Sequence, residues 1–242
     1  MSTRGLTRLY DESMMLSSEP GLTHAADELT LAEVRAEAMR LLNGVPDGEA
    51  LDPLTRELVQ FGVRLCVTSL DVSGAMEHAA SALRLGATAD QLQEIITFVA
   101  GVGMHTLMEG TPALARTLAE HGVALPPRSE AGERLREHWI GDRAYWATFD
   151  ANVPGFLDAL LRLSPPAFEA FMVYGSTTAR GRQVSPLVKE YIAVGCDATP
   201  THRYLPGLRT HLHNAQVVGA GRLALMEVLD LAADMPAHRG IR

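Results

Sequence analysis

An internal repeat constrains the fold most, because a duplicated segment must form the same local structure twice. Residues 53–105 align with residues 186–238 at an offset of 133 without a gap, and 14 of the 53 aligned positions are identical. Chance would give about three or four identities at average residue usage. The matches include Pro, Gly, Glu and His, which align by chance less readily than apolar helix residues. The chain therefore contains two copies of one unit.

Each copy places one carboxylate and one imidazole on an apolar helix face. Glu57 lies within a stripe of apolar side chains at helical spacing, and Glu190 occupies the matching position. His78 and His211 lie in the same way among alanine and leucine residues. This pattern turns all four side chains toward the interior. Because a buried carboxylate must be paired or shift its pKa, we expect a Glu–His contact in each copy.

These pairs have two interpretations. A Glu–His contact can simply join two helices, since buried polar groups are usually hydrogen-bonded. Titratable clusters also concentrate at functional sites. Recurrence does not decide, because duplication copies structural pairs as well as catalytic ones. Glu94 and Glu227 fall beside the apolar stripes, where we expect surface carboxylates or salt-bridge partners.

The local signals are helical along the chain. Asp52-Pro53 and Ser185-Pro186 each combine a capping residue with proline at the first helical position, and Gly86 follows a helix where a left-handed residue is favoured. No segment alternates convincingly with a period of two, so we predict an all-α chain. Helices are expected over 27–42, 133–140, 154–163 and 165–178, with several between 53 and 122 and one opening at 186.

The organisation predicted from these signals has four segments. Residues 1–28 lack a sustained period and are expected to form a mobile arm. The first repeat is placed at 29–124 and the second at 133–242. The stretch 125–132, which contains two adjacent prolines, is the predicted linker.

Composition excludes several functional classes. The net charge is −8, so we expect neither a nucleic-acid nor a membrane partner, since both require a basic face. No stretch approaches the ~20 apolar residues that span a bilayer, and no apolar signal segment follows the N-terminus. Cys66 and Cys196 form no C-x-x-C or zinc spacing, which favours a cytoplasmic protein without disulfides. We expect no cofactor, since nucleotide-binding glycine motifs are absent.

Two sets of motifs surround the paired side chains. The first is Leu54-x-Arg56-Glu57, His78, Leu85-Gly86-Ala87-Thr88 and Gln91-x-x-Glu94-Ile95. The second is Leu187-x-Lys189-Glu190, Thr201-His202-x-Tyr204-x-Pro206-Gly207-Leu208-Arg209, His211 and Gly219-Ala220. Over roughly 50–122 and 165–238 the chain resembles the carboxymuconolactone decarboxylase / alkylhydroperoxidase D-like superfamily. The resemblance implies an all-α fold of two tandem repeats forming a pseudo-dimer, and a homo-oligomer.

One branch of that superfamily is a peroxidase with C-x-x-C just before the histidine. The matching positions hold Asp71 and Gly74 in the first copy, and Tyr204 and Gly207 in the second. Thiol-based peroxide reduction needs an attacking cysteine of low pKa and a resolving partner. We therefore do not expect a thiol peroxidase.

The other branch decarboxylates a small lactone carboxylic acid without a cofactor, and the resemblance implies a lyase of this kind. Glu190 and His211 would then move the proton. Arg209 would hold the carboxylate of the substrate by a two-point contact. Tyr204 would donate a hydrogen bond to the developing enolate oxygen.

By the same resemblance, the first copy would contribute Glu57 and His78 as catalytic residues and His105 as a substrate-binding residue. It has Met76 and Asp71 where the second copy has its arginine and tyrosine. This difference favours the second copy as the site of catalysis.

Other functions remain open. The fold could host an isomerase, a cyclase or a dehalogenase, since each needs one base, one acid and an anion clamp, or it could be a non-catalytic ligand-binding scaffold. A metal site is disfavoured because the His211-x-His213 spacing points the two rings to different sides of a helix. The metal sets considered are Glu57, His78 and His105, or Glu190, His211 and His213.

Overall fold

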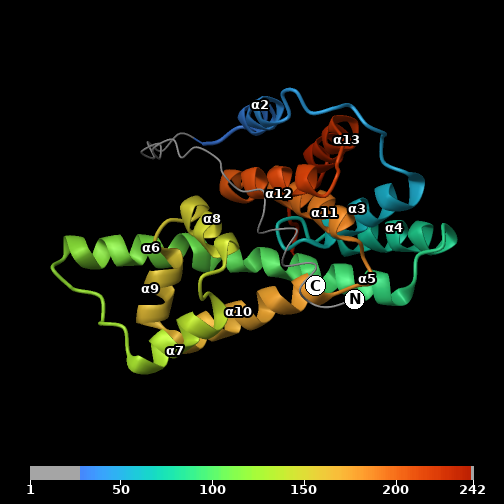
Figure 1. The fold of residues 1–242 in the computed structure, drawn as a ribbon. Helices are drawn as coiled ribbons and strands as arrows, with labels where there is room; N and C mark the ends of the chain where they lie inside the picture. Colours follow the sequence, from blue (N-terminus) through green and yellow to red (C-terminus); the bar gives the residue numbers. More distant parts are fainter. Residues whose placement is uncertain (1–27, 241–242) are drawn as a thin grey trace. The chain divides into compact units, whose positions relative to one another are not determined.

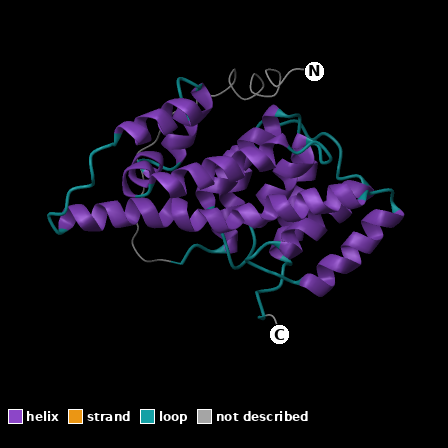
Figure 2. Cartoon of the chain, turned by 90° about the horizontal axis from the view of Figure 1, so that it is seen from below, coloured by secondary structure: helices purple, strands orange, loops and turns teal. Residues whose placement is uncertain are grey.

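The computed structural model describes residues 28–240, and all regular structure in that range is helical, which confirms the all-α prediction (Figure 1 and Figure 2). The predicted arm at 1–28 lies outside the described residues apart from Glu28. The described residues form two compact units. The core unit comprises 28–102 and 181–240, and the middle unit comprises 103–180. The repeat boundaries at 29–124 and 133–242 follow the sequence rather than these units, and they stay a prediction.

The core unit combines helices from both copies. The 3-10 turn η1 (Gly101–Met104) joins it to the middle unit. The helices of the core unit are α2 (Leu31–Leu41), α3 (Pro53–Leu65), α4 (Val72–Arg84), α5 (Ala89–Ala100), α11 (Pro186–Asp197), α12 (Leu205–Val217) and α13 (Arg222–Ala233). Those of the middle unit are α6 (His105–Glu120), α7 (Glu130–Trp139), α8 (Ala144–Asn152), α9 (Phe156–Leu163) and α10 (Pro165–Arg180).

The predicted start signals of the repeated helices are confirmed. The side chain of Asp52 accepts a hydrogen bond from the Thr55 amide at the start of α3. Ser185 accepts one from the Val188 amide at the start of α11. Both helices carry proline in the first turn, where its missing N–H costs nothing.

Three helices begin at other residues than the sequence pattern predicts, and α9 (Phe156–Leu163) starts two residues after the predicted 154. The other two show how a cap sets the start. Helix α2 starts at Leu31 rather than near residue 27, because Thr30 and Glu33 form a reciprocal capping box. Helix α7 starts at Glu130 rather than 133, because Ser129 accepts a hydrogen bond from the Gly132 amide. In each case the cap sets the first residue of the helix, and the apolar period does not.

Helices α3 and α11 cross closely at a glycine from each copy. A Cβ atom on Gly62 would lie 2.8 Å from Cγ2 of Ile192, and one on Gly195 would lie 2.6 Å from Cγ2 of Val63. These glycines are equivalent in the repeat. Their missing side chains allow the two helix backbones to approach.

Ion pairs also link the two copies in equivalent ways. Glu94 contacts Lys189 at 2.7 Å, and Glu227 contacts Arg56. Glu94 accepts hydrogen bonds from the Gln183 and Val184 amides, and Glu227 accepts one from the Leu51 amide. Glu94 and Glu227 are thus salt-bridge partners, one of the two roles expected from the sequence. The equivalence of these contacts supports the predicted tandem arrangement.

Helix crossing at Gly195 gives a first prediction. Gly195→Ala should lower the free energy of unfolding by about 1–3 kcal/mol, because the new methyl group overlaps Val63. Val63→Ala on the same chain should recover part of that loss, since the new methyl group then fills vacated space. Urea denaturation followed by far-UV circular dichroism measures both effects.

Gly175→Ala in α10 is the matched control, because nothing lies within 4 Å of the added Cβ. Alanine is the better helix former by about 1 kcal/mol, so this variant should be neutral or stabilised. Equal losses from Gly195→Ala with and without Val63→Ala would contradict the proposed close contact.

Candidate active site

The structure brings both predicted Glu–His pairs into contact within the core unit. Nδ1 of His78 lies 2.8 Å from Oε2 of Glu57, and Nδ1 of His211 lies 2.7 Å from Oε2 of Glu190. Each pair joins two consecutive helices of its copy, α3 to α4 and α11 to α12. Both contacts were expected from the sequence.

Tight loops align each helix with the next. The loop before α4 contains Leu70 at φ 42°, and the loop before α12 contains Arg203 at φ 49°. Left-handed geometry is uncommon for residues other than glycine, and here it occurs at equivalent positions of the repeat. Backbone hydrogen bonds close both loops, from Asp71 to the carbonyl of Arg64 and from Tyr204 to the carbonyl of Asp197, each at 2.8 Å.

The two carboxylates differ in how far water reaches them. The Glu190 side chain is 9% exposed, whereas that of Glu57 is 22% exposed. Asn214 of α12 also donates a hydrogen bond to the second oxygen of Glu190 at 3.4 Å. The second copy therefore has the drier and more fully bonded carboxylate.

His211 is an acid of raised pKa. Burial alone would lower its pKa, but the Glu190 charge and hydrogen bond, with a smaller contribution from Asp197, raise it to about 9. The imidazole therefore carries a proton at neutral pH. Since its Nδ1 faces Glu190, Nε2 is the nitrogen available to other groups.

Asp197 is a residue that the sequence analysis missed. It lies seven residues after Glu190, on the same face of α11, and its side chain is buried. Burial raises its pKa to about 8; the His211 charge opposes this shift, and Cys66 and Glu190 add to it. A charged residue type at a position in phase with Glu190 was the signal that could have revealed it.

Tyr204 lies at the N-terminal end of α12, the helix that carries His211. It is the N-cap of α12, seven residues before His211, so the two residues share a helix face. Its ring stacks on His202 with centroids 5.3 Å apart. Gly207 lies between Tyr204 and His211 in the sequence. A Cβ atom on Gly207 would lie 2.3 Å from Oδ2 of Asp197, so the carboxyl group of Asp197 packs directly against the α12 backbone.

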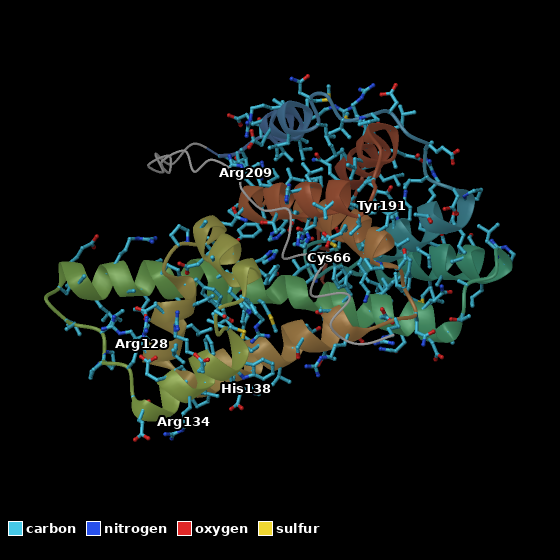
Figure 3. The ribbon with its side chains drawn as sticks, in the orientation of Figure 1. Cys66, Arg128, Arg134, His138, Tyr191 and Arg209 are labelled. Carbon is cyan, nitrogen blue, oxygen red and sulfur yellow. The ribbon has the colours of Figure 1, made fainter. Side chains whose placement is uncertain are left out.

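The structure does not bring Arg209 to the Glu190–His211 pair. Two residues along a helix turn a side chain by about 200°, so Arg209 and His211 lie on opposite faces of α12. Nε of Arg209 donates to Glu37 of α2 at 2.6 Å, and Figure 3 shows Arg209 on α12. The hydrogen bond from Arg40 lowers the pKa of Glu37 to about 2. Arg209 contributes to this decrease, and burial opposes it.

The hydrogen bonds that form the two Glu–His pairs do not involve the other two predicted ligands, His105 and His213. His105 begins α6 in the middle unit, so its predicted role in binding substrate stays a prediction. His213 follows His211 by two residues on α12, and its ring points to a different side, with a pKa lowered by burial. Among the described residues of the core unit, Glu190, His211 and His213 do not gather around one point.

The two cysteines meet in the core although 130 positions separate them in the sequence. Both thiols are buried, and Figure 3 shows Cys66 where α3 ends. A hydrogen bond from Cys196 lowers the pKa of Cys66 to about 7. Thr68 contributes to this decrease, and burial opposes it. Neither cysteine stands at the superfamily's C-x-x-C positions, which hold Asp71, Gly74, Tyr204 and Gly207.

Comparison with known proteins finds a similar solved structure. The chain is similar to a crystal structure from Burkholderia xenovorans, provisionally named a gamma-carboxymuconolactone decarboxylase subunit. The match has a TM-score of 0.64 and 29% sequence identity, and covers 85% of this chain and 91% of the other. This likeness supports the resemblance of the chain to the carboxymuconolactone decarboxylase-like superfamily.

Two further comparisons gave no match. No family model matches the sequence, and no curated protein does. Among the described residues, none of the helices has the length and apolar character needed to cross a bilayer.

The raised pKa values predict how stability depends on pH. His211 binds its proton more firmly when folded, with a pKa of about 9 against an ordinary 6.5, so folding takes up protons between these values. The free energy of unfolding should therefore fall as pH rises from 6.5 to 9, by at most about 1.4 kcal/mol per pH unit for one proton. Asp197 acts in the same direction between 3.8 and about 8.

Urea denaturation at a series of pH values measures this slope. His211→Gln should flatten it above pH 8, where Asp197 contributes little. His121→Gln, which changes an exposed histidine of the middle unit, should keep the wild-type slope. A slope in His211→Gln as steep as in wild type would contradict the raised pKa.

Proposed function

We propose that the protein is a cofactor-independent acid/base enzyme of the carboxymuconolactone decarboxylase type, a lyase acting on a small carboxylated lactone or ring compound. Support comes from the resemblance to the superfamily and from the similar Burkholderia xenovorans structure, which is provisionally named for this activity. The expected homo-oligomer and cytoplasmic location are part of the same proposal.

The reaction requires one bond to break and one proton to be returned. The bond between the ring carbon and the carboxylate breaks, and carbon dioxide leaves. The electron pair passes into the conjugated lactone carbonyl as an enolate. An acid then protonates carbon and restores the neutral lactone. The protein must therefore provide a proton donor and stabilise charge on the enolate oxygen.

The observation that carries the proposal is the contact between His211 and the buried carboxylate of Glu190. Glu190 holds Nδ1 of His211 at 2.7 Å and keeps the ring protonated, with a pKa of about 9. A protonated imidazole whose Nε2–H points away from its carboxylate partner is a positioned acid. After donation, the Glu190 charge favours the return of a proton to the ring.

Neighbouring groups suit the same chemistry. Asp197, with a pKa raised to about 8, carries a proton at neutral pH and can donate a hydrogen bond as a neutral acid. Tyr204 shares the α12 face of His211 and is proposed to donate to the enolate oxygen. Arg209 would have to give up Glu37 to bind a substrate carboxylate, so the proposal does not depend on it.

A structural role for the Glu–His pairs is the second candidate. The Glu57–His78 pair has nearly the same geometry at 2.8 Å, in a copy that lacks the tyrosine and the buried aspartate. This observation favours helix joining as the function of that pair. An isomerase, a cyclase or a dehalogenase would use the same acid and base, and the choice among these depends on the substrate.

Substitutions in both copies test the proposal. With gamma-carboxymuconolactone as substrate, His211→Gln and Glu190→Gln should each lower kcat by at least about 10²-fold, the usual contribution of an acid or base. Wild-type turnover should fall as pH rises through about 9, where the imidazolium of His211 is lost. Carbon dioxide release and lactone consumption measure the rates.

His78→Gln and Glu57→Gln are the matched controls, because they break an equivalent contact in the first copy. These two variants should retain turnover within a fewfold of wild type. Large losses in the first copy alone would move the site there. If all four folded variants kept full turnover, both pairs would be structural.

A further inference from the structure

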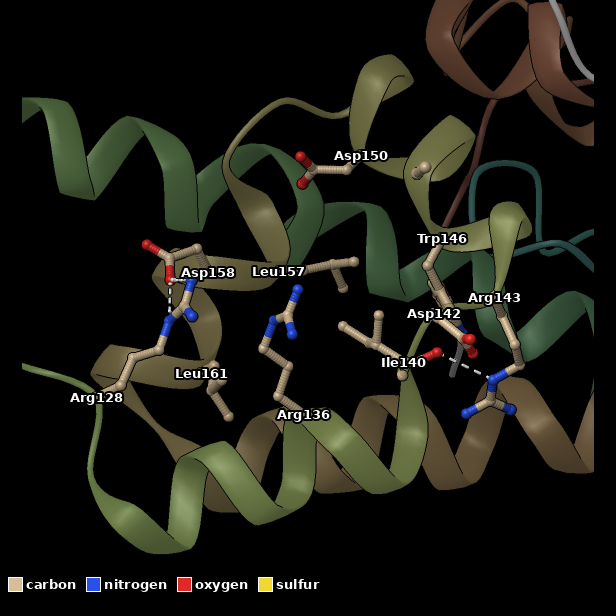
Figure 4. Close-up of a pocket in the computed structure, with 12 residues that line it drawn as sticks. Arg128, Arg136, Ile140, Asp142, Arg143, Trp146, Asp150, Leu157, Asp158 and Leu161 are labelled. Atoms are coloured by element: carbon tan, nitrogen blue, oxygen red, sulfur yellow. Dashed lines mark hydrogen bonds and ion pairs between the residues drawn. The ribbon is translucent and has the colours of Figure 1, made fainter.

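The middle unit contains a cavity of about 300 Å³ that the proposed function does not use. Twelve residues from α7 to α9 and their connections line it (Figure 4). Ile140, Leu157 and Leu161 are buried and provide an apolar floor, and the half-buried ring of Trp146 also lines the space. The volume lies at the lower end of the range for small-molecule pockets.

Arg136 places a cation inside this cavity. It lies in the last turn of α7, and its side chain extends toward Leu157 in Figure 4. Its guanidinium makes no hydrogen bond or ion pair with any residue that the structure describes. The residue is half-buried, so solvation by water is incomplete.

The other arginines of the cavity are already occupied. Arg128 contacts Asp158 at 2.6 Å and Glu133 at 3.3 Å. Arg143 donates to the backbone carbonyls of Ile140, His138 and Trp139. Arg136 is therefore the lining cation that can accept an anion without losing an existing contact in the described chain.

Physical chemistry indicates which anion fits. A guanidinium beside apolar side chains loses hydration, and a carboxylate restores its hydrogen bonds through a two-point contact. Asp142 and Asp150 also line the cavity and are exposed to solvent. Their charges repel ligands with several negative charges, so they favour a single carboxylate over a phosphate or a dicarboxylate.

We propose that this cavity binds a small monocarboxylate with an aromatic or branched apolar body. Arg136 holds the carboxylate, and Trp146, Leu157 and Leu161 contact the body of the ligand. The site is independent of the Glu190–His211 pair, and its ligand is bound without chemical change. The protein would then recognise apolar carboxylates at a second place besides its candidate active site.

Benzoate is the probe for the test, with benzyl alcohol as its neutral and benzylamine as its cationic analogue. Binding to the full chain is measured by ligand-observed NMR and by tryptophan fluorescence, since Trp146 lines the cavity. Benzoate should bind wild type and quench fluorescence, and both analogues should bind at least about tenfold more weakly, since a hydrogen bond to a charged group is lost.

Two neighbouring arginines of α7 give a matched pair of variants. Arg136→Gln should weaken benzoate binding at least about tenfold. Arg134→Gln should leave it unchanged, because Arg134 is exposed and pairs with Glu130 at 2.6 Å. Far-UV circular dichroism confirms that both variants fold. His211→Gln should bind benzoate as wild type does, which separates this site from the candidate active site.

Any of three binding results would overturn the proposal. They are a wild-type chain that does not bind benzoate, an affinity unchanged by Arg136→Gln, and equal binding of benzyl alcohol or benzylamine. Trp139 is the other tryptophan of the chain, so a Trp139→Phe variant isolates the signal of Trp146, and absence of quenching by benzoate in that variant would also overturn the proposal. None of these results would affect the decarboxylase proposal, which is tested by turnover.

Discussion

Helix α11 is buried along nine consecutive residues, from Lys189 to Asp197, and three of these residues carry an ammonium or carboxyl group. Charges removed from water must be compensated, and each of the three is compensated differently. Lys189 contacts Glu94 of the first copy, Glu190 contacts His211, and Asp197 keeps its proton because burial raises its pKa to about 8. The candidate active site is thus a consequence of placing this helix at the centre of the core unit.

The close crossing of α3 and α11 makes that burial possible. Gly62 and Gly195 leave no side chain at the crossing, so the two helices approach until isoleucine and valine methyl groups meet the glycine backbone. The same crossing brings the cysteines of the two copies together, where the Cys196 thiol lowers the pKa of Cys66. A duplicated sequence therefore folds into one shared core, and both copies contribute residues to the contacts between them.

Duplication has not kept the two copies chemically equal. The Glu–His contacts differ by only 0.1 Å, yet the carboxylate of the second copy is less exposed and gains a hydrogen bond from Asn214. Where the second copy has a buried aspartate, the first has Arg64, which pairs with Asp71 at 2.6 Å. An arginine–aspartate pair neutralises charge permanently, whereas a buried aspartic acid exchanges its proton near neutral pH. This difference agrees with catalysis in the second copy and a helix-joining role in the first.

The sequence by itself determined the all-α class, the capped starts of α3 and α11 and the two Glu–His contacts, because each depends on spacing within one repeat and on caps within a few residues. The tertiary structure alone decided the environment of these groups. It paired Arg209 with Glu37 across α12 and α2, and it placed the Cys66 thiol within hydrogen-bond reach of Cys196. It also raised the pKa of Asp197 and left Arg136 in a cavity. Such outcomes depend on which distant helix covers a side chain and excludes water from it, and no local period in the sequence encodes that information.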